Sequence, residues 1–318
     1  MALDASICAG GDGAAIGCRS GEDVLVSVMV GSEGIQEMGD MIEAMKRRVS
    51  VRSYADRPVE QSVKEKIRGL LETHNTGPFG NKVSLSLIDL SDMEQAETRQ
   101  LGTYGFIRGA RLYVAGVVSQ RPGAMQDFGY CLEQVIIRIT HLGLGTCWLG
   151  GTFKRTSFAE RLSLSNDEVI PAISPIGYAR DKRTVRERVL RRFVGADQRK
   201  PWAVLFFEGA MDRPLPREAA GDYATALECL RLAPSASNGQ PWRIVKPKDA
   251  NVFHFFLKRT PGYAKFLRGL DLQLVDMGIA MSHFELAARE TGLDGTWKAG
   301  DPGFGGTEAE YVISWAGK

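Results

Sequence analysis

The sequence predicts two related halves that pack into one body of helices and strands. Five positions, Asp-x-Gly followed by Gly-Leu and Trp, occur twice with the same internal spacing. They are Asp127, Gly129, Gly143, Leu144 and Trp148 in one set, and Asp276, Gly278, Gly292, Leu293 and Trp297 in the other. Self-similarity of this kind indicates a duplicated unit, and five positions in fixed register make chance agreement a poor explanation.

The elements around each repeat also follow the same order. A helix, a loop and a strand are predicted over 63–87 and again over 223–245, and a strand-like run follows each repeat, over 173–178 and 311–315. We therefore divide the chain into a loosely ordered extension (1–35), a first half (36–183), a basic connector (184–199) and a second half (200–318). The extension is rich in Gly, Ala and Ser and carries no motif.

Periodicity supports individual elements within this plan. Apolar residues at helical spacing predict helices over 38–45, 63–71 and 127–142, the last one ending at Gly143. Alternating or continuous apolar runs predict strands over 83–88, 112–118 and 173–178. The segment 143–151 is expected to be a glycine-rich turn, and because it follows a helix, its Gly-x-Gly is not a dinucleotide fingerprint.

Composition excludes several classes of protein. The 318 residues are 44% hydrophobic and 25% charged with a formal net charge of +2, which does not indicate a nucleic-acid or membrane partner. Residues 180–200 hold nine basic and three acidic residues but no interleaved aromatics, which favours a solvated connector. Five scattered cysteines without a Cys-x-x-Cys pair argue against disulfides and zinc. With no transmembrane-length run and no secretory signal, we expect a cytoplasmic protein.

Arg48, Ser50 and Arg52 form a candidate anion site. If this segment is extended, its period of two puts all three side chains on one face and Val49 and Val51 on the other. Two guanidinium groups flanking a hydroxyl can grip a phosphate through charge-assisted hydrogen bonds. A solvated basic helix end is the alternative. Arg199 and Lys200, just before Pro201, could also turn inward toward an anion.

The segment 233–242, Ala-Pro-Ser-Ala-Ser-Asn-Gly-Gln-Pro-Trp, is the second candidate. Small hydroxyl residues, an Asn and a Gly between two prolines predict a tight loop after a helix. Gly239 tolerates a positive φ and allows close approach to the backbone. Such a loop offers donors and acceptors that could read the polar edge of a flat heterocycle, and a plain helix cap and turn is the alternative. Its candidate residues are Pro234, Ser235, Ser237, Asn238 and Gln240.

These motifs together resemble the FMN-dependent nitroreductase family, and more closely its single-chain members in which two such halves are fused in tandem. The resemblance runs over nearly everything after residue 36. It implies an α+β fold with a mixed β-sheet flanked by helices and a pseudo-two-fold relation between the halves. It also implies FMN as cofactor, with Arg48, Ser50 and Arg52 on the phosphate and ribityl chain. The isoalloxazine would be bordered by Pro234, Ser235, Ser237, Asn238 and Gln240. The flavin would also be lined by Gly143, Leu144, Gly145 and Thr146. The phosphate site would gain Arg199 or Lys200.

The two halves depart from the family pattern in complementary ways. Only the first carries Arg-x-Ser-x-Arg, and only the second carries Pro-Ser-x-x-Asn, because the matching first-half loop reads Gly77-Pro78-Phe79-Gly80-Asn81. We therefore expect one flavin per chain and a monomer that imitates the family dimer.

The implied activity is an oxidoreductase that passes a hydride from NAD(P)H through flavin N5 to a nitroaromatic or quinone acceptor. Two alternatives stay open: another flavin reaction, such as dehalogenation or dehydrogenation, and a flavin-free binding or regulatory protein. No catalytic side chain is expected, because the flavin carries the electrons. The histidines are dispersed, and Cys147 is expected to be a packed core thiol.

Overall fold

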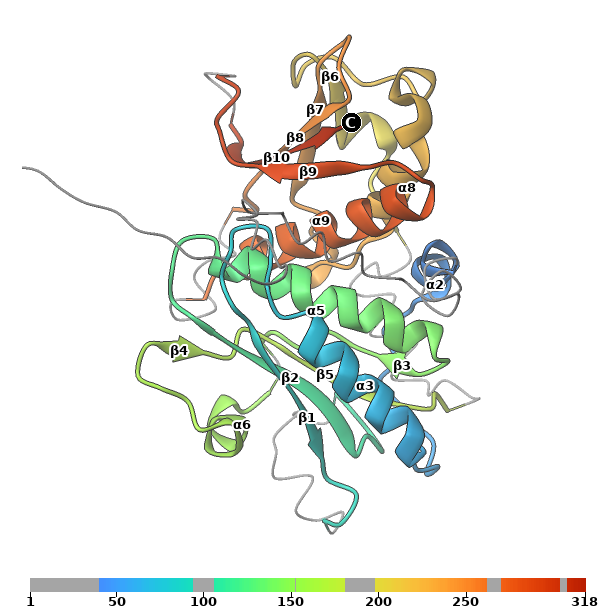
Figure 1. Cartoon of the computed structure of the whole chain (residues 1–318), viewed down its shortest axis with the longest axis vertical. Helices are drawn as coiled ribbons and strands as arrows, with labels where there is room; N and C mark the ends of the chain where they lie inside the picture. The colour runs from blue at the N-terminus through green and yellow to red at the C-terminus, as the bar shows by residue number, and fades with distance from the viewer. Residues whose placement is uncertain (1–39, 94–105, 152, 181–197, 262–269, 304–307) are drawn as a thin grey trace, which may run out of the picture.

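The computed structural model describes residues 40–93, 106–151, 153–180, 198–261, 270–303 and 308–318 (Figure 1). The predicted extension and nearly all of the predicted connector therefore lie outside the described residues. None of the described helices combines the length and apolarity needed to cross a membrane.

The first sheet is built from residues of the predicted first half. Its strands run in the order β1 (Ser84–Asp89), β2 (Leu112–Ser119), β5 (Ile173–Gly177) and β3 (Gly145–Thr146), and β4 (Glu168–Val169) also pairs with β2. All of these pairs are antiparallel. The register places Leu87 opposite Val114 and Ile173 opposite Ala115. β2 is buried almost throughout, as its continuous apolar run predicts.

The second sheet is built from residues of the predicted second half. Its order is β6 (Phe206–Glu208), β7 (Trp242–Lys246), β8 (Val252–Leu257), β10 (Glu310–Gly317) and β9 (Gly295–Lys298). β6 and β7 are parallel and the other pairs are antiparallel, so this sheet is mixed as expected. In the described part of the first half, parallel pairing occurs only at isolated bridges, such as Ser50 with Thr146.

The two sheets repeat one topology. The path β1-β2-β5-β3 has the same chain order and the same antiparallel pairing as β7-β8-β10-β9. A helix precedes the first strand of each path, and a long helix links the second strand to the edge strand. β6 alone has no counterpart in the first path. The chain therefore has an α+β fold of two related halves.

Helices α5 (Ala124–His141) and α9 (Leu272–Glu290) lie between the two sheets (Figure 1). The other described helices surround this arrangement. They are α2 (Met41–Arg47), α3 (Gln61–Thr73), α6 (Arg155–Leu162) and α8 (Ala224–Leu232), with short 3-10 turns at Trp202–Val204, Glu218–Tyr223 and Ala236–Asn238. α5 begins three residues before its predicted start. α3 and α5 pack on the first sheet, α9 packs on the second, and α2 contacts α5, α8 and α9.

α5 and α9 form the central contact between the halves, and glycine makes it possible. A Cβ atom on Gly129 of α5 would clash with the carbonyl oxygen of Val275, and one on Gly278 of α9 would clash with that of Gln126. The repeated Asp-x-Gly thus marks the point where two helix backbones approach most closely. Because α9 is buried on nearly all sides, it lacks the polar stripe of a surface helix.

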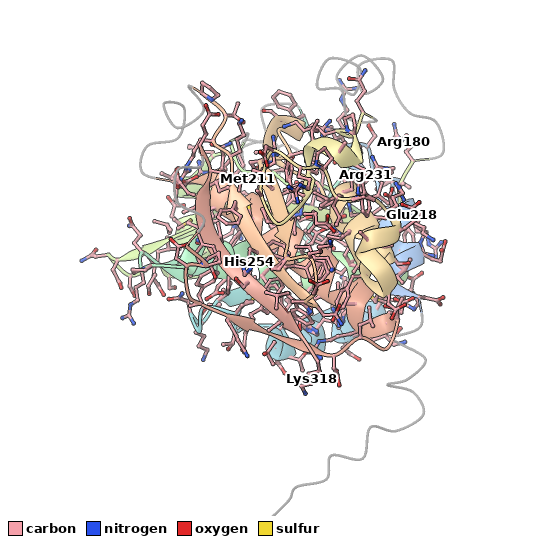
Figure 2. All side chains as sticks on the ribbon, turned by 90° about the horizontal axis from the view of Figure 1, so that it is seen from above. Arg180, Met211, Glu218, Arg231, His254 and Lys318 are labelled. Carbon is pink, nitrogen blue, oxygen red and sulfur yellow. The ribbon has the colours of Figure 1, made fainter. Side chains whose placement is uncertain are left out.

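Aromatic side chains fill the space between α9 and the second sheet. Phe253 and Phe255 of β8 contact Phe284 of α9, with ring centroids 5.2 and 5.5 Å apart. The residue between them, His254, points to the opposite face, where its Nδ1 lies 2.7 Å from Ser314 Oγ on β10 (Figure 2). Successive side chains of β8 therefore point to opposite faces of the sheet, although no strand is predicted there from the sequence.

Candidate functional site

The first group of candidate residues lies where α2 leads into an extended segment beside β3. Ser50 pairs with Thr146 in a parallel bridge, and Val51 N donates to Thr146 O at 2.8 Å. A Cβ atom on Gly145 would lie only 2.7 Å from Val51 Cγ2, so the close approach requires glycine there. The structure therefore brings Arg48, Ser50 and Arg52 next to the segment of Gly143, Leu144, Gly145 and Thr146. Gly145 and Thr146 form a short strand within the predicted turn.

Two buried side chains of this group have polar atoms without a hydrogen-bond partner among the described residues. Arg48 is only 9% exposed, yet its Nε and Nη1 have no hydrogen-bond partner among the described residues. Thr146, 1% exposed, likewise has an unpartnered Oγ1 within the described part of the chain. Unpaired buried donors are costly, and a buried guanidinium without a counter-charge more so. A site that keeps such groups is suited to an anionic ligand.

The second group is the loop that follows α8. Positive φ angles fall on Ser237 (50°), Asn238 (54°) and Gln240 (46°), whereas Gly239 has a φ of −65°. Gly239, which tolerates a positive φ, does not adopt one here. Three non-glycine residues hold that conformation instead, and such backbone strain persists only where surrounding contacts enforce it.

Several hydrogen bonds enforce the loop. Gln240 N donates to Ser235 Oγ at 2.9 Å, closing the turn that begins after Pro234. Lys200 N donates to Gln240 Oε1 at 2.8 Å, and Lys200 Nζ donates to Gly239 O at 2.6 Å. Arg199 Nη1 donates to Asn238 Oδ1 at 2.9 Å. Arg199 and Lys200 thus lie against this loop, and burial lowers the pKa of Lys200.

A repeated aspartate holds the corresponding loop in each half, which the sequence analysis did not assign. Asp276 Oδ1 accepts from Ala236 N at 2.9 Å, while Asp127 accepts from Phe79 N and Asn81 N at 2.9 and 2.8 Å. Burial raises the pKa of Asp276 to about 8 and also raises that of Asp127. The signal that could have revealed this role is the repeat, because both aspartates stand at its first position.

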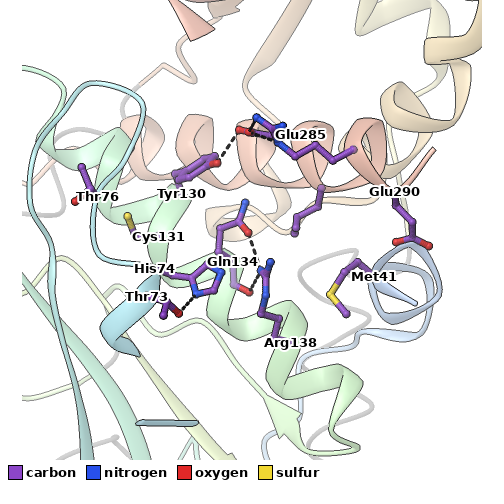
Figure 3. A pocket seen from close by; sticks show the side chains of 12 residues that line it. Met41, Thr73, His74, Thr76, Tyr130, Cys131, Gln134, Arg138, Glu285 and Glu290 are labelled. Atoms are coloured by element: carbon purple, nitrogen blue, oxygen red, sulfur yellow. Dashed lines mark hydrogen bonds and ion pairs between the residues drawn. The ribbon is translucent and has the colours of Figure 1, made fainter. Parts of the chain in front are cut away.

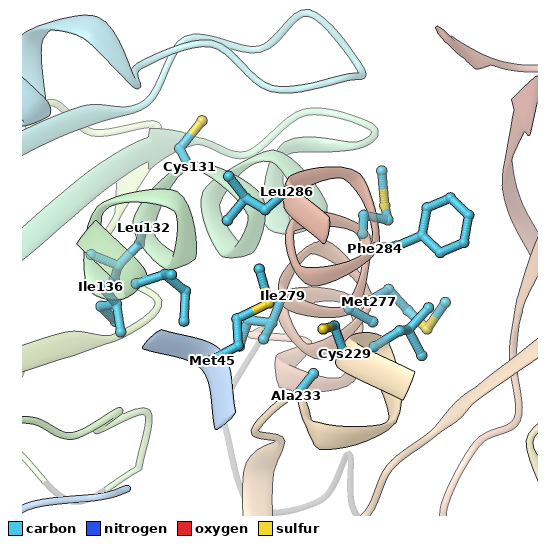
Figure 4. Packing of buried hydrophobic residues seen from close by; sticks show 14 of the residues in the cluster. Met45, Cys131, Leu132, Ile136, Cys229, Ala233, Met277, Ile279, Phe284 and Leu286 are labelled. Carbon is cyan, nitrogen blue, oxygen red and sulfur yellow. The ribbon is translucent and has the colours of Figure 1, made fainter. Parts of the chain in front are cut away.

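Helix packing links the two groups. α2 leads into the Arg48 segment, α8 leads into the 234–240 loop, and the two helices contact each other. Met45, near the end of α2, and Ala233, just after α8, belong to one buried cluster (Figure 4). This cluster also contains Ile136 of α5 and Ile279 of α9. The Arg48 segment of the first half and the 234–240 loop of the second half therefore both follow helices that pack in the same hydrophobic core.

Comparison with known proteins identifies the family. The family model described as "Putative TM nitroreductase" matches residues 40–288. The chain therefore belongs to this nitroreductase family. No curated protein matches it.

The chain is similar to solved structures, and the first of these shares its fold over most of both chains. A putative nitroreductase from Thermotoga maritima msb8 is 22% identical with a TM-score of 0.55, over 86% of this chain and 92% of that chain. A nitroreductase family protein from Clostridium difficile 630 is 23% identical with a TM-score of 0.36, over 48% of this chain and 91% of that one. An FMN-dependent nitroreductase from Clostridium difficile R20291 is 20% identical with a TM-score of 0.35, over 45% and 90%.

Proposed function

We propose that the protein is an FMN-dependent oxidoreductase that uses NAD(P)H to reduce nitroaromatic or quinone-type acceptors. Membership of a nitroreductase family supports the reaction class. The observation that carries the cofactor is the Arg48 guanidinium, which is nine-tenths buried with Nε and Nη1 unpartnered among the described residues. A phosphate group would satisfy these donors, since a guanidinium fork matches its oxygens.

The chain's own residues would divide the work of binding. Arg48, Ser50 and Arg52 would hold the phosphate and ribityl chain, with the Thr146 hydroxyl as a further partner. Gly143, Leu144 and Gly145 would let the backbone approach the cofactor closely. The strained loop of Pro234, Ser235, Ser237, Asn238 and Gln240 would border the ring from the second half.

Bound FMN would supply the hydride chemistry between the nicotinamide and the acceptor. Since Arg199 and Lys200 contact the 234–240 loop, we propose that they lie beside the ring as well as being available to the phosphate. Their positive charge would stabilise negative charge that develops beside them on reduction. Asp276 would act as a positioning residue, because its bond to Ala236 N fixes the start of the 3-10 turn that carries Ser237 and Asn238.

One flavin per chain follows from the same geometry. The segment ahead of α8, where a second Arg-x-Ser-x-Arg would stand, forms β6 beside β7, far along the sheet from the edge strand β9. The first-half loop over 77–81 has no serines and is held by Asp127. We therefore propose a monomer with one composite site, in which the fused halves take the place of two subunits.

A visible absorption spectrum tests the proposal, followed by denaturation to count released flavin. About one FMN per chain, bleached by NADH or NADPH and restored by a quinone, is the expected result. Two flavins per chain would contradict the single composite site. A chain that stays colourless after FMN is added would favour the binding-protein alternative.

A further inference from the structure

A second region of interest is a cavity between the two halves, lined by α3, α5, α9 and the start of α2. Its volume is about 300 Å³, and the lining comes from both halves (Figure 3). α3 and the residues after it supply Thr73, His74 and Thr76; α5 supplies Tyr130, Cys131, Gln134 and Arg138; α9 supplies Glu285, Leu286, Arg289 and Glu290; Met41 comes from α2. None of these residues belongs to the proposed flavin site.

The duplication explains why the cavity exists. α2 packs against α5, α8 and α9. In the repeated topology, α5 and α9 are counterparts of each other, and α3 is the counterpart of α8. A second copy of α2 in the other half would therefore pack against α9, α3 and α5. These are the helices that line the cavity. In the described part of the second half, the residues before α8 form β6 and two 3-10 turns, and no α-helix there takes the place of a second α2.

The lining of the cavity is polar, unlike the apolar surface against which α2 packs. α2 buries Met41, Ala44 and Met45 in the apolar cluster. In the cavity, by contrast, charged and neutral polar side chains predominate. Two arginines and two glutamates give the lining no formal net charge: Arg289 pairs with Glu285 at 2.7 Å, Arg138 donates to Gln134, and Glu290 accepts from Ile42 N at 2.9 Å. The balance favours an uncharged ligand over an ion.

Gln134 aims a hydrogen-bond donor into this space. The residue is 5% exposed, and its Oε1 accepts from Arg138 Nη1 at 2.7 Å. A guanidinium can only donate, so the atom facing it must be the amide oxygen. The amide NH₂ is then turned to the cavity, and it has no partner among the described residues (Figure 3).

His74 supplies an acceptor to the same space. Its Nδ1 lies 3.0 Å from the carbonyl oxygen of Leu70, which can only accept, so Nδ1 carries the proton and Nε2 keeps a lone pair. Burial and the nearby Arg138 lower the pKa of His74 to about 4, which keeps the ring neutral. A fixed donor on α5 and a fixed acceptor after α3 therefore face one cavity.

We propose that this cavity binds a small uncharged molecule with a primary amide or lactam edge. The ligand's carbonyl oxygen accepts from Gln134 Nε2 and its N–H donates to His74 Nε2, while Leu286 and Met41 contact the apolar part. The volume suits a ligand of about one ring. This site is independent of the proposed flavin chemistry.

Ligand-observed NMR on the full chain, with benzamide as the probe, tests the proposal. Benzamide should bind, and acetophenone, which has the same shape but no N–H, should bind about tenfold more weakly, the usual effect of one lost hydrogen bond. Benzoate should not bind, because its charge has no free counter-charge in the cavity. Absence of benzamide binding at millimolar concentration overturns the proposal.

Variants locate the probe. Gln134→Leu should weaken benzamide binding about tenfold, whereas Gln120→Leu, a matched change at an exposed position, should leave it unchanged. Leu286→Phe fills the cavity while keeping the polar groups, so it should abolish binding even if Gln134→Leu fails to fold. If Leu286→Phe binds normally, or if Arg48→Ala removes the binding, benzamide occupies another site and the proposal is wrong.

Discussion

Glu133 and His283 join the two halves by a hydrogen bond of 2.8 Å between Oε1 and Nε2, with both side chains completely buried. Each has a second partner: Trp148 Nε1 donates to Glu133 Oε2 at 2.6 Å, and His283 Nδ1 lies 3.0 Å from the carbonyl oxygen of Cys229. The pair links α5 to α9, and through Cys229 it reaches α8.

Removing one member of this pair should destabilise the whole chain. Glu133→Ala leaves His283 and Trp148 without a buried acceptor, and we expect a loss of about 3–5 kcal/mol in the free energy of unfolding. Urea denaturation followed by fluorescence measures it. Asp40→Ala is the control, because the exposed Asp40 lies 3.9 Å from the half-buried His141 and its removal should cost less than about 1 kcal/mol. Equal losses in the two variants would contradict the structural role of the buried pair.

Glycine substitutions should separate packing from loop conformation. Gly129→Ala and Gly278→Ala each force α5 and α9 apart, so we expect destabilisation of several kcal/mol, about what overpacking costs or more. Gly239→Ala should be nearly neutral, since its φ is −65° and the nearest atom to a Cβ, Ala236 O, is 3.3 Å away. Thermal unfolding of the three variants provides the comparison. A large drop in Tm for Gly239→Ala alone would contradict the loop geometry.

Arg48→Ala should abolish retention of FMN while the chain stays folded. The substitution removes the buried guanidinium proposed to bind the phosphate, and flavin content after gel filtration measures the effect. Arg57→Ala is the control, because Arg57 is exposed, pairs with Glu60 at 2.6 Å, and should retain the wild-type flavin content. Retention of FMN by Arg48→Ala would disprove the phosphate assignment.

Asp276 should make stability fall with rising pH. Its pKa in the folded chain, about 8, is above the ordinary value of 3.8, so the folded state binds the extra proton between these values. This contribution is fully present below about pH 4 and is lost as the pH rises through about 8, with a slope of up to about 1.4 kcal/mol per pH unit.

Asp276→Asn keeps an acceptor for Ala236 N and removes the titration. The difference in unfolding free energy between the wild type and this variant should therefore grow in favour of the variant from pH 5 to pH 8. Urea denaturation across this range measures it, and a pH-independent difference would contradict the raised pKa.

The duplicated architecture could be predicted from sequence because it depends on local signals. The repeated Asp-x-Gly stands on the central helices, and the apolar periods of 63–71 and 112–118 match α3 and β2. β8 was missed although Phe253, Phe255 and Phe256 are buried in it. Its partners β7 and β10 lie on both sides, and β10 begins more than fifty residues later, so no local pattern reveals the pairing.

The candidate site was only partly predictable for a similar reason. Sequence placed Arg48, Ser50 and Arg52 on one face, but the bridge between Ser50 and Thr146 depends on contacts between distant segments. The positive φ angles of Ser237, Asn238 and Gln240 could not be predicted from residue type, which favours glycine. They depend on the hydrogen bond that Ala236 N donates to Asp276 and on the one that Lys200 N donates to Gln240. The cavity beside Gln134 lies where the described residues of the second half provide no counterpart of α2.

Covalent fusion changes what a single substitution can do to this fold. In a symmetric homodimer every replacement appears twice, so a change that damages one interfacial site damages its mate as well. In this chain each half has its own sequence, so α2 and the 234–240 loop can change without any change at the matching positions of the other half. One half could therefore lose its arginine-bearing segment and keep an open, polar space, while the other kept its buried guanidinium unchanged.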